Sequence, residues 1–146
     1  MLNIQRFDYS NEPLFKKAFA IRTNVFVEEL NIDPLLEADE FDKIAHHYLL
    51  LENQIPVGVA RWRETENGIK LERFAVPKSH RGKGFGEFLL KEVLKDVVTI
   101  QKKIYLHSQH TAVNLYLRNG FEISGEPFFE AGIKHFYMEY KGNVQK

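Results

Sequence analysis

The segment Arg81-Gly82-Lys83-Gly84-Phe85-Gly86 separates an apolar run typical of a strand, residues 71–76, from a run with helical periodicity, residues 85–97. A glycine-rich turn between a strand and a helix leaves backbone N–H groups uncovered. It directs them, together with the positive end of the helix dipole, at one point. Arg81 and Lys83 add positive charge beside that point. The segment therefore predicts a site for an anion, most often a phosphate or pyrophosphate.

The composition indicates a single ordered domain over residues 1–146. Apolar residues make up 44% of the chain, which is enough for a hydrophobic core, and the formal net charge is zero. A neutral balance argues against nucleic acid as a partner, because nucleic-acid-binding domains are normally basic. The absence of cysteine excludes disulfides, thiolate metal sites and a cysteine nucleophile. Without a long apolar run or a signal-peptide pattern, we expect a soluble cytoplasmic protein with no membrane partner.

Apolar periodicity predicts elements in the order β-α-α-βββ-α-β-α-ββ, an α+β fold with a mixed, mostly antiparallel central sheet flanked by helices. The expected strands are residues 2–9, 47–52, 57–63, 69–76, 104–107, 121–129 and 134–140. The expected helices are residues 10–29, one short helix within 31–42, residues 84–101 and residues 111–118. Asn67-Gly68 predicts a tight hairpin turn, since this pair supplies positive φ angles.

Two common phosphate-binding patterns are absent. The chain has no G-x-x-x-x-G-K-[ST], which excludes a nucleoside triphosphatase loop, and its glycines read G-x-G-x-G, not the G-x-G-x-x-G of a dinucleotide site. A six-residue glycine motif alone could also be a purely structural turn.

Arg81-x-x-Gly84-x-Gly86, after a strand ending in Phe74-Ala75-Val76, resembles the acyl-CoA-binding signature Q/R-x-x-G-x-G/A of the GNAT superfamily of N-acetyltransferases. Residues 112–121 resemble a second family motif, A-x-x-x-Y-x-x-x-G-F, with Tyr116 at its centre. Element order and length also match, so the resemblance covers essentially the whole chain. Gln109 stands where the family commonly has the Asn that contacts the cofactor.

Within this superfamily the chain most resembles the small ElaA-like branch. The branch stretch R-x-x-V-F-V-x-E-Q appears at residues 22–30, with Leu30 in place of the final Gln. The acidic residues Glu37-x-Asp39-x-x-Asp42 followed by His46, and the late segment 132–135, also match that branch.

The resemblance implies transfer of an acetyl group from acetyl-CoA to a primary amine, by direct attack in a ternary complex. It assigns cofactor binding to Phe74, Ala75, Val76, Arg81, Gly82, Lys83, Gly84, Phe85, Gly86 and Gln109. Backbone groups of residues 74–76 would bind the pantetheine arm, and the N–H of Phe74 or Ala75 would donate to the thioester carbonyl. Tyr116 would be the general acid toward the departing thiolate; alternatively it is only a core residue of an amphipathic helix.

Glu72 is the candidate general base. It shares a strand face with Phe74 and Val76 by the two-residue period, so its carboxylate could accept a proton directly or through water. Partial burial is expected to raise its pKa toward a useful range. The alternative is that Glu72 only pairs with a neighbouring strand cation, Arg61 or Arg73.

Glu29 and His135 are the candidates for binding the acceptor. Glu29 ends the first helical region, where the family builds one wall of the acceptor pocket. A carboxylate there could attract a cationic amine, or it could equally belong to a solvated face. His135 is favoured over His46 and His47 by the branch resemblance, although a lone histidine is more often structural. The acidic run 37–42 lacks the pattern of a calcium loop, so we expect a solvated loop and no metal.

Two other functions compete with acetyl transfer. One is a non-catalytic acyl-CoA sensor or interaction module, and the other is acyl-homoserine-lactone synthesis on a related fold. The acceptor itself is left open between peptide N-termini, lysine, polyamines, amino sugars and aminoglycosides. Pairing of C-terminal strands would allow a homodimer.

Overall fold

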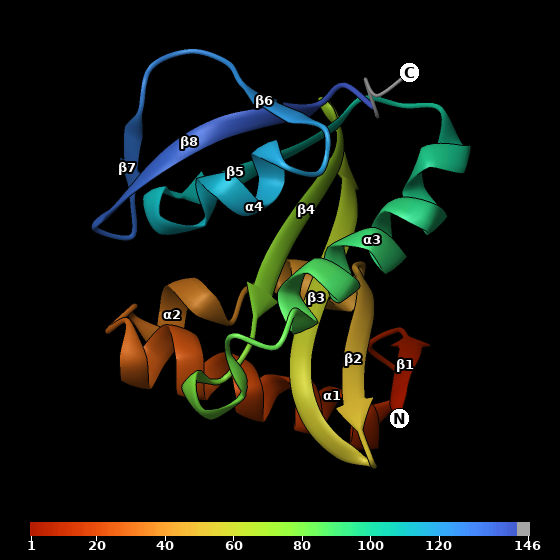
Figure 1. The fold of residues 1–146 in the computed structure, drawn as a ribbon. Helices are drawn as coiled ribbons and strands as arrows, with labels where there is room; N and C mark the ends of the chain where they lie inside the picture. Colours follow the sequence, from red (N-terminus) through yellow and green to blue (C-terminus); the bar gives the residue numbers. More distant parts are fainter. Residues whose placement is uncertain (143–146) are drawn as a thin grey trace.

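The fold is built on one mixed sheet with strand order β1-β2-β3-β4-β5-β8-β6 and β7 paired to β8 (Figure 1). It is seen in a computed structural model that describes residues 1–142. The strands are β1 (Leu2–Phe7), β2 (His46–Glu52), β3 (Ile55–Thr65), β4 (Gly68–Ala75), β5 (Ile104–Gln109), β6 (Phe121–Ile123), β7 (Phe128–Glu130) and β8 (Ile133–Tyr140). All neighbours pair antiparallel except β4 and β5, which are parallel. The expected α+β fold is confirmed.

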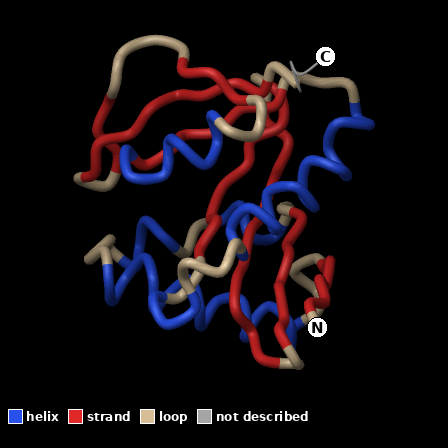
Figure 2. Tube along the Cα trace, in the orientation of Figure 1, coloured by secondary structure: helices blue, strands red, loops and turns tan. Residues whose placement is uncertain are grey.

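Helices lie on both faces of the sheet (Figure 2). The α-helices are α1 (Glu12–Arg22), α2 (Pro34–Glu37), α3 (Phe85–Val97) and α4 (Val113–Leu117), and a π-helix (Thr23–Glu29) continues α1. Short 3₁₀ turns occupy Glu40–Lys43, Lys78–His80, Val98–Ile100 and His110–Ala112. Within residues 1–142, no helix is long and apolar enough to cross a membrane.

Two apolar clusters hold the helices to the sheet. The larger cluster packs α3 and Tyr116 of α4 against the sheet, with Leu71, Leu89 and Leu106 among its buried members. The smaller cluster packs α1 and the π-helix against the other face, through Val25, Leu49 and Val59 among others. The strands contribute apolar side chains to both clusters, because successive side chains of a strand point to opposite faces of the sheet.

The parallel pair β4–β5 is short. Its ladder joins only Ile69–Leu71 to Ile104–Leu106. Beyond these residues the two strands diverge, and β4 runs on toward α1 and α2 while β5 turns away (Figure 1). The last half of β4 therefore has a strand partner on the β3 side only.

Three details differ from the sequence-based expectation. The single strand predicted over 121–129 is two strands, β6 and β7, because Gly125 takes a positive φ of 85° and Pro127 has no N–H to donate. At Asn67-Gly68, only Gly68 has a positive φ. A turn in which both central residues have a positive φ occurs instead at Asn53-Gln54, between β2 and β3. The first helix changes from α to π geometry after Arg22.

Gly68 is required where β4 begins beside Lys103. Its φ is +135°, and a Cβ there would lie 2.4 Å from the Lys103 carbonyl oxygen. We predict that Gly68→Ala lowers the free energy of unfolding by about 2–4 kcal/mol, from backbone strain plus the clash. Gly125→Ala is the control, because that glycine also has a positive φ but a Cβ on it would meet nothing within 4 Å. Urea unfolding of both variants gives the comparison, and equal losses would contradict the role of the Lys103 contact.

Candidate active site

A cavity of about 810 Å³ opens where β4 and β5 separate. Its walls come from β4, β5, the start of α3, α4, the π-helix and the turn between β7 and β8. The predicted site residues that line it are Glu29, Glu72, Phe74, Ala75, Val76, Arg81, Gly82, Gly84, Phe85, Gly86, Gln109, Tyr116 and His135. Lys83 is not part of the lining. One cavity therefore brings together the predicted cofactor, catalytic and acceptor residues.

The glycine turn forms an open cradle at the start of α3. Gly82 and Gly84 both have φ of +82°, and a Cβ on either would project into space with nothing within 4 Å. Phe88 N–H donates to the Gly84 carbonyl at 3.0 Å, so the amides of residues 85–87 lie before the first helical hydrogen bond. Gly84, as N-cap, offers no side chain to them. Uncovered amides at a helix start fit an anion such as pyrophosphate.

Arg81 is held across the cradle by two partners. Its guanidinium donates to both carboxylate oxygens of Glu29, at 2.7 and 2.6 Å, and its Nε donates to the Val76 carbonyl at 2.8 Å. The hydrogen bonds from Arg81 lower the pKa of Glu29. Glu29 therefore lies at the anion cradle, already engaged with a cation, and its predicted contact with an acceptor amine stays a prediction.

The end of β4 carries a β-bulge beside the cavity. Glu72 is opposite Arg61 and Ala75 is opposite Val59, so Arg73 and Phe74 share one position of β3. Arg73 takes a φ of +58°, which costs a non-glycine residue about 1–3 kcal/mol. Its guanidinium donates to the Glu37 carbonyl and the Asp39 carboxylate, at 3.0 and 3.1 Å, and these contacts stabilise the bulge.

Tyr116 reaches the same cavity from α4. The residue is only 6% exposed, and its ring packs edge-on against Phe74 and Phe121. Burial raises the pKa of the Tyr116 phenol, so the group is protonated at neutral pH. Among the described residues its hydroxyl has no hydrogen-bond partner, and it is available to donate to a ligand.

Glu72 is surrounded by the cations Arg61, Arg63 and Lys70. Its carboxylate accepts hydrogen bonds from Arg61 and Arg63, both at 2.8 Å, and Lys70 Nζ lies 3.4 Å away. Burial opposes the charge, but the Arg61 charge and the Arg63 hydrogen bond outweigh it and lower the pKa of Glu72. The expected upward shift is wrong. The alternative pairing with Arg61 is confirmed, and it makes Glu72 a weak proton acceptor.

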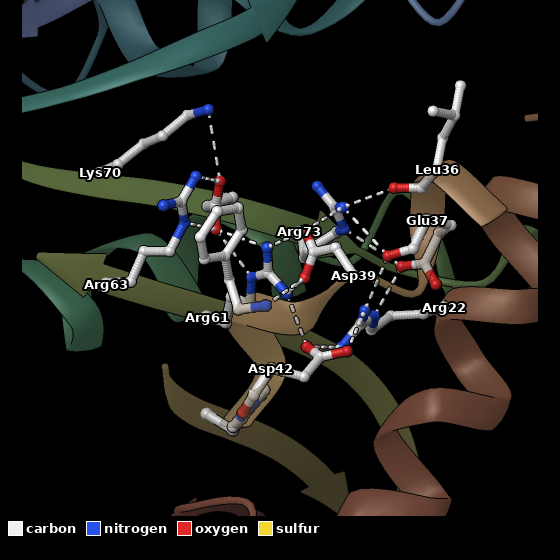
Figure 3. A network of polar contacts seen from close by, with 12 residues as sticks. Arg22, Leu36, Glu37, Asp39, Asp42, Arg61, Arg63, Lys70 and Arg73 are labelled. Carbon is white, nitrogen blue, oxygen red and sulfur yellow. Dashed lines mark hydrogen bonds and ion pairs between the residues drawn. The ribbon is translucent and has the colours of Figure 1, made fainter. Parts of the chain in front are cut away.

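Through Arg61, Glu72 belongs to a larger buried ion network that joins three parts of the chain. Arg22, Glu37, Asp39, Asp42 and Arg61 of this network are labelled in Figure 3. Arg22, at the end of α1, pairs with Glu37 and Asp42 at 2.6 and 2.8 Å. Arg61 of β3 pairs with Asp42 at 2.6 Å and with Asp39 at 2.8 Å. Arg22 and Arg61 are 2% and 1% exposed. The expectation of a solvated acidic loop is therefore wrong, because Glu37 and Asp42 are buried against these arginines.

The histidines divide between structure and cavity. His46 is exposed and stacks on Trp62, and His47 is buried with Nε2 at 2.9 Å from the Asp42 carbonyl. His135 lines the cavity, and its Nδ1 lies 2.7 Å from the Ile133 carbonyl. Sequence reasoning missed His107 and Glu130, which line the cavity with their side chains 2.9 Å apart. In the sequence, the only indication of this pair is that His107 lies at the end of a predicted strand.

The network predicts a stability effect. In Asp42→Asn, the buried guanidinium groups of Arg22 and Arg61 lose the anion they share, so the free energy of unfolding should fall by about 3 kcal/mol or more. Glu40→Gln is the matched control, because it removes one negative charge from an exposed position in the same segment. Urea unfolding followed by the fluorescence of Trp62, the only tryptophan in the sequence, measures both. Similar values for the two variants would contradict the role of the network.

The sequence and the fold resemble those of known proteins. Residues 9–141 match the family model described as an acetyltransferase (GNAT) domain. The chain is 36% identical over 130 residues to the "Uncharacterized N-acetyltransferase YjcF" of Bacillus subtilis strain 168, an alignment that covers 88% of this chain and 93% of that protein.

Solved structures show the same architecture. Escherichia coli ElaA superposes with a TM-score of 0.85 and 26% identity, covering 96% of this chain and 99% of that one. A Bacillus subtilis acetyltransferase solved in complex with CoA superposes with a TM-score of 0.68 and 18% identity, covering 97% and 99% of the two chains. Together with the family match, these similarities confirm the resemblance stated from the glycine and tyrosine motifs: the chain belongs to the GNAT acetyltransferase family and is an acyltransferase.

Proposed function

We propose that this enzyme transfers an acetyl group from acetyl-CoA to a primary amine by direct attack in a ternary complex. The observation that carries the proposal is the convergence of the glycine cradle, the unpaired edge of β4 and the Tyr116 ring on one cavity. An anion site and a protonated phenol in the same cavity are what acyl transfer from a thioester of CoA requires.

The residues present fit CoA. The cradle amides and Arg81 would hold the pyrophosphate, because Gly82 and Gly84 leave open space in front of the α3 N-terminus. The free edge at the end of β4, residues 74 and 75, together with Val76 directly after it, would hydrogen-bond the pantetheine arm, since backbone groups without a strand partner need another one. Bound acetyl-CoA supplies the activated acyl group. The complex of CoA with a protein of the same fold supports this assignment.

The remaining residues would serve the chemistry. Tyr116 would donate its proton toward the departing sulfur, and its burial keeps that proton in place until substrate is bound. The N–H of Phe74 or Ala75, beside the bulge, would donate to the thioester carbonyl as charge develops on its oxygen. Glu72, with its lowered pKa, would hold Arg61 and Arg63 in place instead of accepting a proton.

Calorimetry and thiol release test the proposal together. Acetyl-CoA and desulfo-CoA should both bind, and CoA should be released when benzylamine, tyramine, spermidine, glucosamine or lysine is added. If neither acetyl-CoA nor desulfo-CoA binds at about 1 mM, the assignment of the cradle as a pyrophosphate site is contradicted. Binding without thiol release across the amine panel would favour the acyl-CoA sensor instead.

Tyr116→Phe separates catalysis from binding. The variant loses only the hydroxyl, so we expect kcat to fall by about 10²-fold while the Kd for acetyl-CoA changes by less than about twofold. Tyr9→Phe, at an exposed tyrosine outside the cavity lining, is the control and should keep the wild-type rate. A wild-type kcat in Tyr116→Phe would remove this residue from the mechanism.

Glu29→Gln tests the Arg81 contact. Pyrophosphate and the Glu29 carboxylate would compete for the same guanidinium, so removing the carboxylate charge should lower the Kd for CoA. Because both side chains are partly exposed, we expect only about a two- to fivefold effect. Glu28→Gln removes the neighbouring exposed charge and controls for net charge. Weaker CoA binding in Glu29→Gln would show that the carboxylate supports the site.

A further inference from the structure

The part of the cavity wall formed by β5 and β7 holds a histidine–carboxylate pair that the mechanism above does not use. His107 of β5 and Glu130 of β7 both line the cavity, and His107 Nδ1 lies 2.9 Å from Glu130 Oε1. The hydrogen bond from His107 lowers the pKa of Glu130 to about 2, so the carboxylate is ionised. The pair is held together by a charge-assisted hydrogen bond.

This contact decides which ring nitrogen is basic. An imidazole that donates through Nδ1 to a carboxylate presents Nε2 as its acceptor when neutral. Among the described residues, no hydrogen bond occupies His107 Nε2. The His107 ring also packs against Phe128 and Tyr137, with centroid separations of 5.1 and 6.0 Å. Together with Glu130, these two rings set its orientation.

His107 lies at the point where the strands separate. Leu106 is the last β5 residue paired with β4, and His107 follows it. Leu106 and Tyr116 both belong to the cluster on the α3 face. By strand alternation His107 projects to the opposite face. A proton donor and a proton acceptor therefore approach the same opening from opposite sides of the sheet.

Two other titratable side chains of the cavity lining already have hydrogen-bond partners. Glu72 is bound by Arg61 and Arg63, and His135 bonds a backbone carbonyl through Nδ1. The titratable groups facing His107 are Glu130 of β7, Tyr105 of β5, Tyr137 and His135 of β8, and Lys70 and Glu72 of β4.

We propose that His107, oriented by Glu130, accepts the proton that the amine nitrogen loses during acyl transfer. This inference rests on the proposed function. The nitrogen forms a bond to the carbonyl carbon, and the carbon–sulfur bond breaks. The nitrogen's proton passes to His107 Nε2, and the sulfur leaves with its electron pair and takes a proton from Tyr116. Both side chains return to their starting states by exchange with solvent.

The test uses the whole chain of residues 1–146 and the amine that the wild type acetylates fastest in the panel above. In His107→Gln, kcat should fall by about 10²-fold with an unchanged Kd for acetyl-CoA. In His107→Ala, added imidazole should restore turnover in proportion to its concentration, because the lost ring leaves space on the cavity wall. His46→Gln, at an exposed histidine outside the lining, is the control with wild-type activity.

Glu130→Gln keeps the imidazole and serves as the second variant if His107 substitutions fail to fold. It should lose about tenfold in kcat, because the developing imidazolium loses its anion, and it should not respond to imidazole. A wild-type kcat in His107→Gln, or a loss in His107→Ala that imidazole leaves unchanged, would overturn the assignment. A wild type that binds acetyl-CoA and releases no CoA would instead overturn the proposed function.

Discussion

The short ladder between β4 and β5 is the constraint on which the site depends. Parallel pairing over only residues 69–71 and 104–106 holds the two strands together at one end and lets them diverge at the other. The glycine turn follows the free end of β4, and α4 follows the free end of β5. Anion cradle, unpaired backbone and buried phenol therefore meet at one opening, although they come from segments far apart in the sequence.

The buried ion network keeps that opening in shape. Arg22, Arg61 and Arg73 bind the carboxylates of Glu37, Asp39 and Asp42, and so join α1, the loop after α2, and strands β3 and β4 (Figure 3). Desolvating these charges is costly, so the network stabilises the fold only while every partner is present. With Glu72 and its further partners Arg63 and Lys70, the network holds five cations and four carboxylates, so it has no excess of negative charge. For the proposed amine acceptor, we therefore expect recognition by the rest of the cavity, where His107 and Glu130 lie.

The cradle and its helix could be predicted from sequence because the information is local. Glycines at positions 82 and 84 are needed for their φ angles, and the period of the following apolar residues defines α3. The environment of Glu72 could not be predicted, because strand alternation gives its face but not the cations that converge on it from β3 and β4. The burial of the acidic run 37–42 could not be predicted for the same reason, since the arginines that pair with it come from distant segments. His107 was missed because its partner Glu130 comes from β7, where one long strand was expected.

The central claim is that the separated end of β4 and the α3 N-terminus together hold the acyl donor. The most direct measurement is a titration of the isotopically labelled protein with acetyl-CoA, followed by backbone amide NMR. We expect the largest chemical-shift changes at the amides of residues 82–87 and 74–76, with smaller changes in β1 and β2. Changes that spare both segments, or that centre on another surface, would contradict it.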